Sequence, residues 1–464
     1  MNLKNITSIS NFMKLKLLFV AVALGIGVAA AAQTAEMPKY QRSSLHMVLM
    51  KTNEEALKGT TDYTPLIQKY WKNYPFPDKY NKHDVAIADI DAGTPKASMM
   101  ALINKYGKNI NSLDIAEAKA LMQSMTKGSE YKQSLVDTLE INIAKNKVGN
   151  QLIRKWFNIK DDGSWDYDLI MERAEYNANQ ADIAKANATT RGIRAICDDG
   201  EELISNTFVT FSKISFYESE PVAAFVRDLA KFIGSFTGPA AAAAYAAADV
   251  AYTATKDGYT AKTTTALYKL EWTEEIKGEF YAMFKEDGKI DMQKFNDFTF
   301  PMTLVGIDDA TSSTFNAQAG FAESVGAQAK KPAEDVIQQT IVRNIDKILA
   351  KMQRTYEVFA PVSQIISTDP VLLADMGMKE GLEGGESFNL LQPTYNEKTN
   401  KVEWKSVGVV KVDKKQIWDN RYALTDEAKK AAEESEVKGT VLSANKKAVP
   451  GMVVRQVVKA AKKK

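Results

Sequence analysis

The pattern of hydrophobic and polar residues predicts two long β-strands, over residues 201–217 and 259–272. Both stretches are rich in β-branched and aromatic residues, which suit the pleated surface of a sheet. Residues 268–272 alternate between apolar and polar types, as in a strand with one dry face and one wet face. In the first stretch the apolar phase changes near Ser212, so the pattern predicts a β-bulge there.

The segment between these strands, residues 221–258, is too long for a hairpin turn and predicts a helical hairpin. Pro221 can start a first helix, and Gly238-Pro239 separates it from an alanine-rich second helix. Residues 232–248 carry no charge, but the run is short for a membrane span and the Gly-Pro pair interrupts it. Tight packing of small residues is the favoured interpretation, and insertion into a membrane is the alternative.

Helical periodicity is clearest over residues 332–352, where isoleucine or leucine recurs every four residues, with acids near the start and lysines near the end. Three helices are expected over residues 97–157, with Asp114 as a start signal for one of them, and another over residues 169–186. A polar loop is expected over residues 308–328. Further strands are expected at 43–50, 84–92, 298–305, 356–367, 387–391, 402–412 and 416–419.

These elements predict the α+β class: an antiparallel sheet with packed helices and an alanine-rich helical hairpin insertion, plus a small C-terminal β-barrel-like module. A main domain is expected over residues 33–355, with the helical insertion at about 221–258. The small β domain is expected over 356–422, followed by a charged helix and a basic tail over 423–464.

Residues 1–32 have the features of a secretory signal peptide. Lysines precede a long apolar run that ends in small residues. We expect cleavage and export to the periplasm or the outer membrane, with an uncleaved membrane anchor as the alternative. No cysteine ends the run, so a lipoprotein is not expected.

The net charge and the cysteine content limit which partners the protein can bind and whether disulfides can stabilise it. Removal of residues 1–32 takes away three lysines and no acid, so the formal net charge changes from +2 to about −1. Near-neutrality argues against a nucleic-acid-binding surface. The single Cys197 cannot form an intrachain disulfide and is expected to be a small buried residue, so stability must come from packing.

Aromatic residues are concentrated at residues 70–80 (YWKNYPFPDKY), where two prolines predict an extended surface loop. Here Trp71, Tyr74 and Phe76 are candidate binding residues, because they could stack against a sugar ring or a peptide. The alternative is that the same side chains fix the loop to the domain.

Asp89 and Asp91 lie near the end of the strand predicted over residues 84–92 and on the same face of it. Paired carboxylates can perform acid-base catalysis or bind a cation. Aspartates at strand ends also commonly cap turns, and that role is the alternative here.

No catalytic residue, metal site or cofactor is expected. Residues 161–168 and 286–295 imitate calcium-binding loops but lack the required ligand spacing, so both are expected to be turns. With only His46, His83 and one cysteine, a zinc site and a Cys/His nucleophile pair are both difficult to build. Walker loops, dinucleotide fingerprints and nucleophile elbows are also missing from the sequence.

Residues 376–388 (MGMKEGLEGGESF), followed by residues 407–412 (VGVVKV), resemble the compact β domains at the ends of bacterial envelope-assembly proteins such as flagellar assembly protein T. In those domains a turn of the type G-x-K-x-G-L-x-x-G-x-x-F precedes a barrel strand. Together with residues 200–209 and 417–422, the whole chain resembles an uncharacterised family of secreted Bacteroidota proteins. The resemblance implies an envelope location and no known activity.

The sequence therefore predicts a non-catalytic, secreted structural or interaction protein of the cell envelope. Envelope proteins or glycan are the expected partners, nucleic acid is not expected, and peripheral membrane contact is left open as an alternative. One alternative is a carboxylate-dependent glycan hydrolase, which needs two carboxyls about 5–10 Å apart beside aromatic side chains; its candidate residues are Asp89, Asp91, Asp166, Trp71 and Trp165. A second alternative is a membrane-inserting assembly component that uses residues 232–248.

Overall fold

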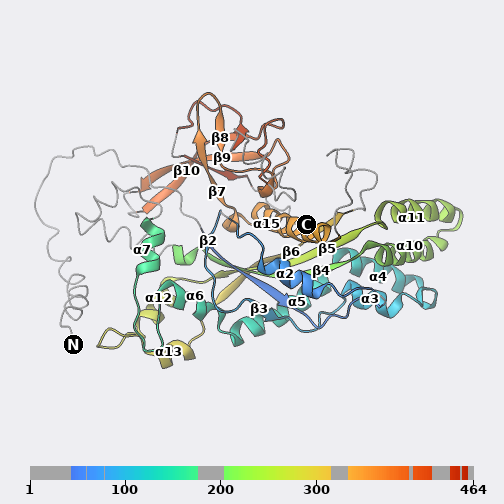
Figure 1. Cartoon of the computed structure of the whole chain (residues 1–464), viewed down its shortest axis with the longest axis horizontal. Coiled ribbons are helices and arrows are strands. Elements are labelled where there is room, and N and C mark those ends of the chain that lie inside the picture. Colours follow the sequence, from blue (N-terminus) through green and yellow to red (C-terminus); the bar gives the residue numbers. More distant parts are fainter. Residues whose placement is uncertain are drawn as a thin grey trace, which may run out of the picture.

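The computed structural model describes residues 43–175, 203–314, 333–396, 401–420, 439–449 and 452–457, except residues 59 and 78. The expected signal peptide, Cys197, most of the helix expected over residues 169–186 and the helix expected after residue 422 lie outside these residues. The α+β class is confirmed, because the described chain forms two six-stranded sheets with many helices. In Figure 1 the second sheet lies above the layer that the first sheet forms with its helices. A pair of helices projects from one end of that layer.

The first sheet has the strand order β2-β1-β4-β5-β6, with β3 paired to β1. Its strands are β1 (Ser44–Lys51), β2 (Asn81–Lys82), β3 (Asp89–Asp91), β4 (Thr207–Glu218), β5 (Tyr259–Leu270) and β6 (Met302–Thr314). The two long strands predicted from the sequence pair antiparallel, and β6 pairs antiparallel with β5. β1 makes only parallel pairs, with β2, β3 and β4. The sheet is therefore mixed.

The helices are α2 (Thr64–Lys72), α3 (Met99–Tyr106), α4 (Ile115–Lys127), α5 (Ser129–Lys145), α6 (Val148–Trp156), α7 (Asp168–Glu175), α10 (Ser219–Ser235), α11 (Ala241–Thr255), α12 (Glu274–Tyr281), α13 (Met292–Asp297) and α15 (Ala333–Thr355). Short 3-10 helices are η1 (Ile110–Ser112), η2 (Gly238–Ala240), η3 (Glu357–Phe359) and η4 (Met378–Glu380). Asp114 caps α4 through a capping box with Glu117, as the sequence predicts. Residues 97–157 contain four α-helices instead of three, because Lys147 has a left-handed φ of 49° and interrupts the third.

The bulge expected near Ser212 is wrong, because the β4–β5 register runs without a shift from Phe208 to Glu218. Both apolar phases of β4 are buried, since helices cover both faces of the sheet. Phe211 packs in the cluster formed with α5 and α6, whereas Ile214 and Phe216 pack in the cluster formed with α2 and α15. Alternation of apolar and polar residues is not required in such a strand.

Three strand boundaries also differ from the expectation. β4 begins at Thr207, because residues 203–205 are helical. β6 begins after Pro301 and continues to Thr314, so the loop expected from residue 308 is wrong for residues 308–314. β6 lies at the edge of the sheet and has a register shift beside Leu267 of β5, as expected for a strand that follows a proline. Of residues 84–92, only Asp89–Asp91 form a strand.

The second sheet is the predicted β module, with the strand order β10-β9-β12-β7-β8-β11 and antiparallel pairing throughout. Its strands are β7 (Val362–Ser367), β8 (Leu372–Ala374), β9 (Ser387–Asn396), β10 (Lys401–Lys411), β11 (Thr440–Leu442) and β12 (Val453–Gln456). A bridge between Val412 and Leu442 connects its two ends, so the sheet curls into a partial barrel. β11 and β12 fall within residues 423–464, where a charged helix and a basic tail were expected, but their valine and leucine side chains are buried in this module.

The helical hairpin predicted between β4 and β5 is confirmed as α10 and α11. α10 packs on α4 through Phe225 and Leu229, which are buried with Ala118 and Leu121. α11 packs on the other side of α10, and a Cβ atom at Gly234 would lie 2.8 Å from the Cβ of Ala244. Glycine at position 234 therefore allows the close approach of the two helices.

Candidate functional site

Trp71, Tyr74 and Phe76, the candidate binding residues, are half-buried and pack in two different clusters. Residues 70–72 belong to α2, so the expected extended loop begins only after this helix. Trp71 and Tyr74 pack in the cluster formed with α15, and the Tyr74 hydroxyl donates a hydrogen bond to Asp346 Oδ1 at 2.5 Å. Phe76 packs in a different cluster, with Phe359. This separation favours the alternative role, in which the three side chains fix the segment to the domain.

The candidate carboxylates take part in local structure. Asp89 forms an ion pair with Lys51 at 2.8 Å, and Asp91 Oδ1 accepts a hydrogen bond from the Gly93 amide at 2.8 Å, which is the turn-capping role. Asp166 accepts a hydrogen bond from Asn158 Nδ2 at 2.5 Å. Trp165 packs against Phe284 and donates its indole N–H to the Gly288 carbonyl. These contacts do not create the aromatic-lined carboxylate pair that a glycan hydrolase needs.

The two loops that imitate calcium sites form turns, as predicted. They are joined through the Ile290 amide, which donates to the Gly163 carbonyl at 2.9 Å, and through an ion pair between Lys289 and Asp162 at 2.9 Å. Asp291 caps the start of α13. Within the described residues no group of three histidine, cysteine, aspartate or glutamate side chains is placed to hold a metal ion.

His83 belongs to a buried polar network that connects α6 and α7 to the first sheet. Arg173 donates hydrogen bonds to His83 Nδ1 at 2.9 Å and to Ser44 Oγ at 2.7 Å, and its guanidinium lies 4.5 Å from the centre of the Trp156 ring. Because arginine is only a donor, His83 Nδ1 accepts, and the Nε2 proton faces the Leu152 carbonyl at 3.1 Å. Burial and the Arg173 charge lower the pKa of His83, so the ring is neutral.

His46 is also a structural residue. Its Nε2 lies 2.6 Å from the Ile87 carbonyl, and its Nδ1 lies 3.7 Å from Asp84 Oδ1. Burial lowers the pKa of His46, and the nearby Ile87 carbonyl and Asp84 only partly oppose that effect. Both histidines are therefore held by carbonyls of the main domain, which explains their presence without catalysis.

A group of charged side chains lies on the face of the first sheet that α5 covers. Glu54, from the segment after β1, forms an ion pair with Lys213 of β4 at 2.9 Å, and both side chains are largely buried. On the neighbouring strands, Asp309 of β6 forms an ion pair with Lys132 of α5. Burial opposes ionisation of Asp309, but the hydrogen bond and the charge of Lys132 outweigh it and lower the pKa of this carboxyl.

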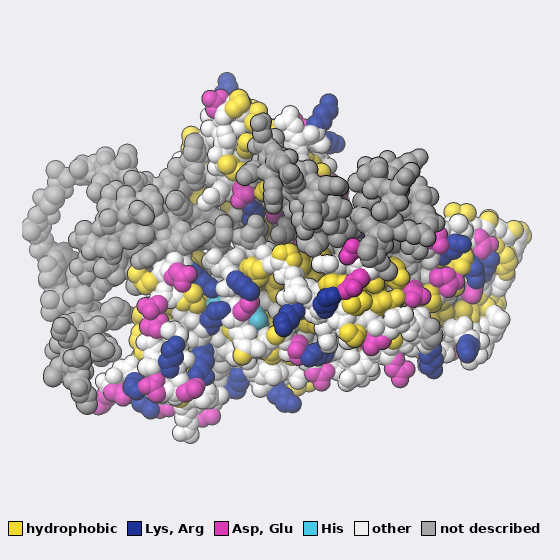
Figure 2. Space-filling view, in the orientation of Figure 1, with side chains coloured by type: hydrophobic (Ala, Val, Ile, Leu, Met, Phe, Trp, Pro, Cys, Tyr) yellow, Lys and Arg dark blue, Asp and Glu magenta, His cyan; other side chains and the backbone are white. Residues whose placement is uncertain are grey.

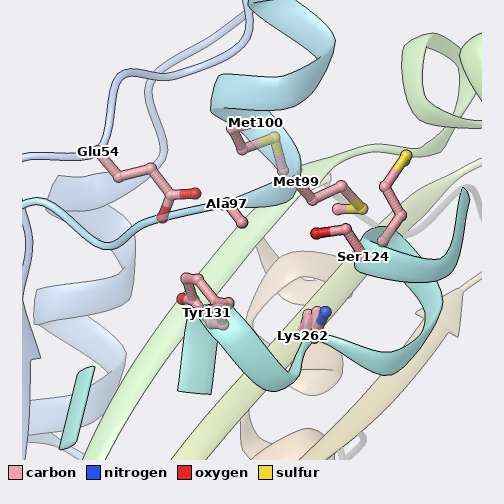
Figure 3. Close-up of a pocket in the computed structure, with 9 residues that line it drawn as sticks. Glu54, Ala97, Met99, Met100, Ser124, Tyr131 and Lys262 are labelled. Atoms are coloured by element: carbon pink, nitrogen blue, oxygen red, sulfur yellow. The ribbon is translucent and has the colours of Figure 1, made fainter. Parts of the chain in front are cut away.

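Lys262 of β5 lies between these two ion pairs. Among the described residues its ammonium has no hydrogen-bond or ion-pair partner, and burial lowers the pKa of the amine. Lys262 lines a hollow with an empty volume of about 360 Å³, part of which is open to solvent. Figure 3 shows Met99 and Ser124 above Lys262, and Glu54 on the other side. The lining residues are Glu54, Ala97, Met99, Met100, Ser124, Met125, Gly128, Tyr131 and Lys262.

The second candidate site is the end of the helical hairpin, residues 232–248, which we call the hairpin tip. Ala248 is the single buried residue of α11. Phe236, in the turn between the helices, is 59% exposed, and Tyr245 is also exposed. Figure 2 shows hydrophobic side chains gathered on this projecting end of the molecule. Among the described residues no helix combines the length and apolar character needed to cross a bilayer.

No protein-family model and no curated protein matches the chain. Functional assignment therefore has to come from the two sites described above.

Proposed function

We propose that the protein is an exported, non-catalytic component of the bacterial cell envelope, which binds a membrane surface peripherally through the hairpin tip. The observation that carries the proposal is the exposed, charge-free end of the α10–α11 hairpin, with Phe236 at its turn. Grouped apolar side chains on the surface of a folded protein commonly mark a surface for a partner or a membrane.

Charged residues are confined to the base of the hairpin. Lys231 of α10 and Asp249 of α11 form an ion pair at 2.6 Å, which marks the boundary of the tip. Nearer the sheet, Arg227 contacts Asp228 at 2.8 Å and lies over the ring of Tyr252. With a helical rise of 1.5 Å per residue, the tip extends on the order of 10 Å beyond the Lys231–Asp249 pair. That length fits shallow insertion at a lipid interface.

The serine and threonine hydroxyl groups of the hairpin tip are satisfied internally. Ser235 Oγ donates to the Phe232 carbonyl at 2.7 Å, and Thr237 Oγ1 donates to the Gly234 carbonyl at 2.6 Å. Polar groups need hydrogen-bond partners within the protein when water is removed. This requirement is strictest in lipid, which offers no hydrogen bonds. A projecting apolar end whose serine and threonine hydroxyls are bonded internally therefore suits lipid better than a protein partner, because a typical protein interface also includes about ten hydrogen bonds.

A flotation experiment with neutral phosphatidylcholine vesicles tests the proposal. It uses the chain without residues 1–32, because an apolar signal peptide would itself bind lipid. We expect this protein to float with the vesicles, also in high salt, because the charges at the hairpin base are paired with each other. Phe236→Asp should remove flotation, because a charge would have to enter the apolar layer.

The matched control is Ile141→Asp on α5. Ile141 is 68% exposed, so this substitution also replaces an exposed apolar residue with a charge, but on a different part of the molecule. It should leave flotation unchanged. If the unmodified chain stays with the soluble fraction, or if both variants float equally well, the hairpin tip does not bind lipid. In that case crosslinking in envelope fractions should show whether the hairpin holds an envelope protein instead.

A further inference from the structure

The positive and negative side chains around Lys262 are unequal in number. Three lysines, at positions 132, 213 and 262, share one face of the sheet with the two carboxylates of Glu54 and Asp309. Each carboxylate already forms an ion pair with one lysine, and the ammonium of Lys262 remains without one among the described residues. The charges of Asp309 and Glu54 only partly offset the hydration that the Lys262 ammonium loses on burial, because neither carboxylate contacts it directly. An anion bound at this position would complete the pairing.

Lys262 lies in a hollow that is open to such a ligand. β5 positions the lysine, and the opposite walls come from the first turn of α3, the end of α4 and the start of α5. Met99, Met100 and Met125 supply flexible apolar walls, which adapt to ligands of different shape. Ser124 adds a hydroxyl to the wall of the hollow.

We propose that this hollow binds a small aliphatic monocarboxylate. The carboxylate would form an ion pair with Lys262, and its short chain would contact the three methionines. A single lysine without an ion pair, in a hollow with no arginine among its lining residues, suits one negative charge better than a phosphate, which is usually held by several donors. The apolar walls favour an anion that also carries a hydrocarbon chain. The enclosed part of the hollow has room for little more than a water molecule, so a short chain has to lie in the part that is open to solvent or displace the methionine side chains.

Hexanoate is a suitable probe, and the methyl groups of the methionines report its binding. The full chain is labelled with carbon-13 at the methionine methyls, and the signals are followed by NMR during titration. Saturable shifts are expected for Met99, Met100 and Met125, with no change for Met352, which is buried in a different cluster. Hexanol has the same chain length without the charge, so its binding should be weaker by about tenfold or more.

Two variants separate charge recognition from nonspecific apolar binding. Lys262→Gln should weaken hexanoate binding by about tenfold or more and leave hexanol binding unchanged. Lys119→Gln removes an exposed lysine from α4 and should change neither. The proposal is overturned if hexanoate gives no saturable shifts, or if hexanol binds as tightly as hexanoate. The hexanol comparison uses the unmodified chain and decides the question even if Lys262→Gln fails to fold.

Discussion

α15 and α11 differ in the burial of their apolar residues: α15 buries them against the first sheet, whereas α11 leaves most of them exposed. α15 carries charges of both signs, yet Ile337, Ile341 and Ile345 are all buried against the first sheet. α11 has the more apolar sequence, but it covers α10 along one side only and buries Ala248 alone. The burial of α15 explains why that helix forms. The exposure of α11 is the basis of our proposal that the hairpin tip serves an interaction outside this chain.

The largest expected effect comes from a cavity under α15. Ile341 is 0% exposed, and Ile341→Ala should lower the free energy of unfolding by about 2–5 kcal/mol, because lost burial and an unfilled cavity both destabilise the fold. Chemical denaturation monitored by circular dichroism measures this change. A loss below about 1 kcal/mol would show that α15 is not a central packing element.

A smaller effect is expected at the contact between α10 and α11. Gly234→Val places side-chain atoms against Ala244 and should cost about 1–3 kcal/mol, by separating the two helices. Hydrogen exchange measured by mass spectrometry should show faster exchange in α11 and unchanged exchange in α15. Gly278→Ala on α12 is the control, because no atom lies within 4 Å of the added Cβ. Equal exchange in both variants would contradict the described contact.

The pH dependence of stability should also distinguish the two helices. Burial and a hydrogen bond to Glu334 of α15 raise the pKa of Tyr70 to about 12. The folded state therefore holds this proton more tightly than the unfolded state, and stability should fall as the pH rises from about 10 to about 12. Tyr70→Phe should flatten this decline, as measured by denaturation midpoints across the range. Tyr252→Phe on exposed α11 should flatten it less, and the reverse order would be inconsistent with the burial of Tyr70.

The smallest effect is expected on the exposed side of α11. Val250 is 70% exposed, so Val250→Ala should change the free energy of unfolding by no more than about 0.5 kcal/mol. The same denaturation assay measures it beside Ile341→Ala. A loss comparable to that of Ile341→Ala would mean that α11 is covered by another part of the chain.

The success of the sequence prediction depended on how far apart in the chain the contacting residues are. The periodicity of α15 and the Asp114 cap of α4 are local signals, and both were predicted correctly. The bulge at Ser212 was predicted wrongly, because Ile214 and Phe216 are covered by α15, which follows more than 100 residues later. A period of two has no meaning in a strand whose two faces are both dry.

The candidate sites also depend on contacts between distant parts of the chain, which the sequence pattern does not reveal. The hairpin tip was visible in the sequence as a charge-free run, but its exposure became clear only from the packing of α10 against α4. Lys262 has no distinguishing feature in a strand that also contains Lys269. Only the fold shows that Glu54 pairs with Lys213 and that Asp309 pairs with Lys132, which leaves Lys262 beside the hollow.

The depth of residue 236 in a bilayer tests the central claim most directly. A nitroxide spin label is attached at Phe236→Cys in a chain without residues 1–32 and with Cys197→Ser, and its accessibility to oxygen and to a water-soluble nickel complex is measured by electron paramagnetic resonance. With phosphatidylcholine vesicles, we expect oxygen contact to rise and nickel contact to fall, as for a side chain that enters the apolar layer. Accessibility that is unchanged by vesicles would show that the hairpin tip stays in water, and would contradict the account.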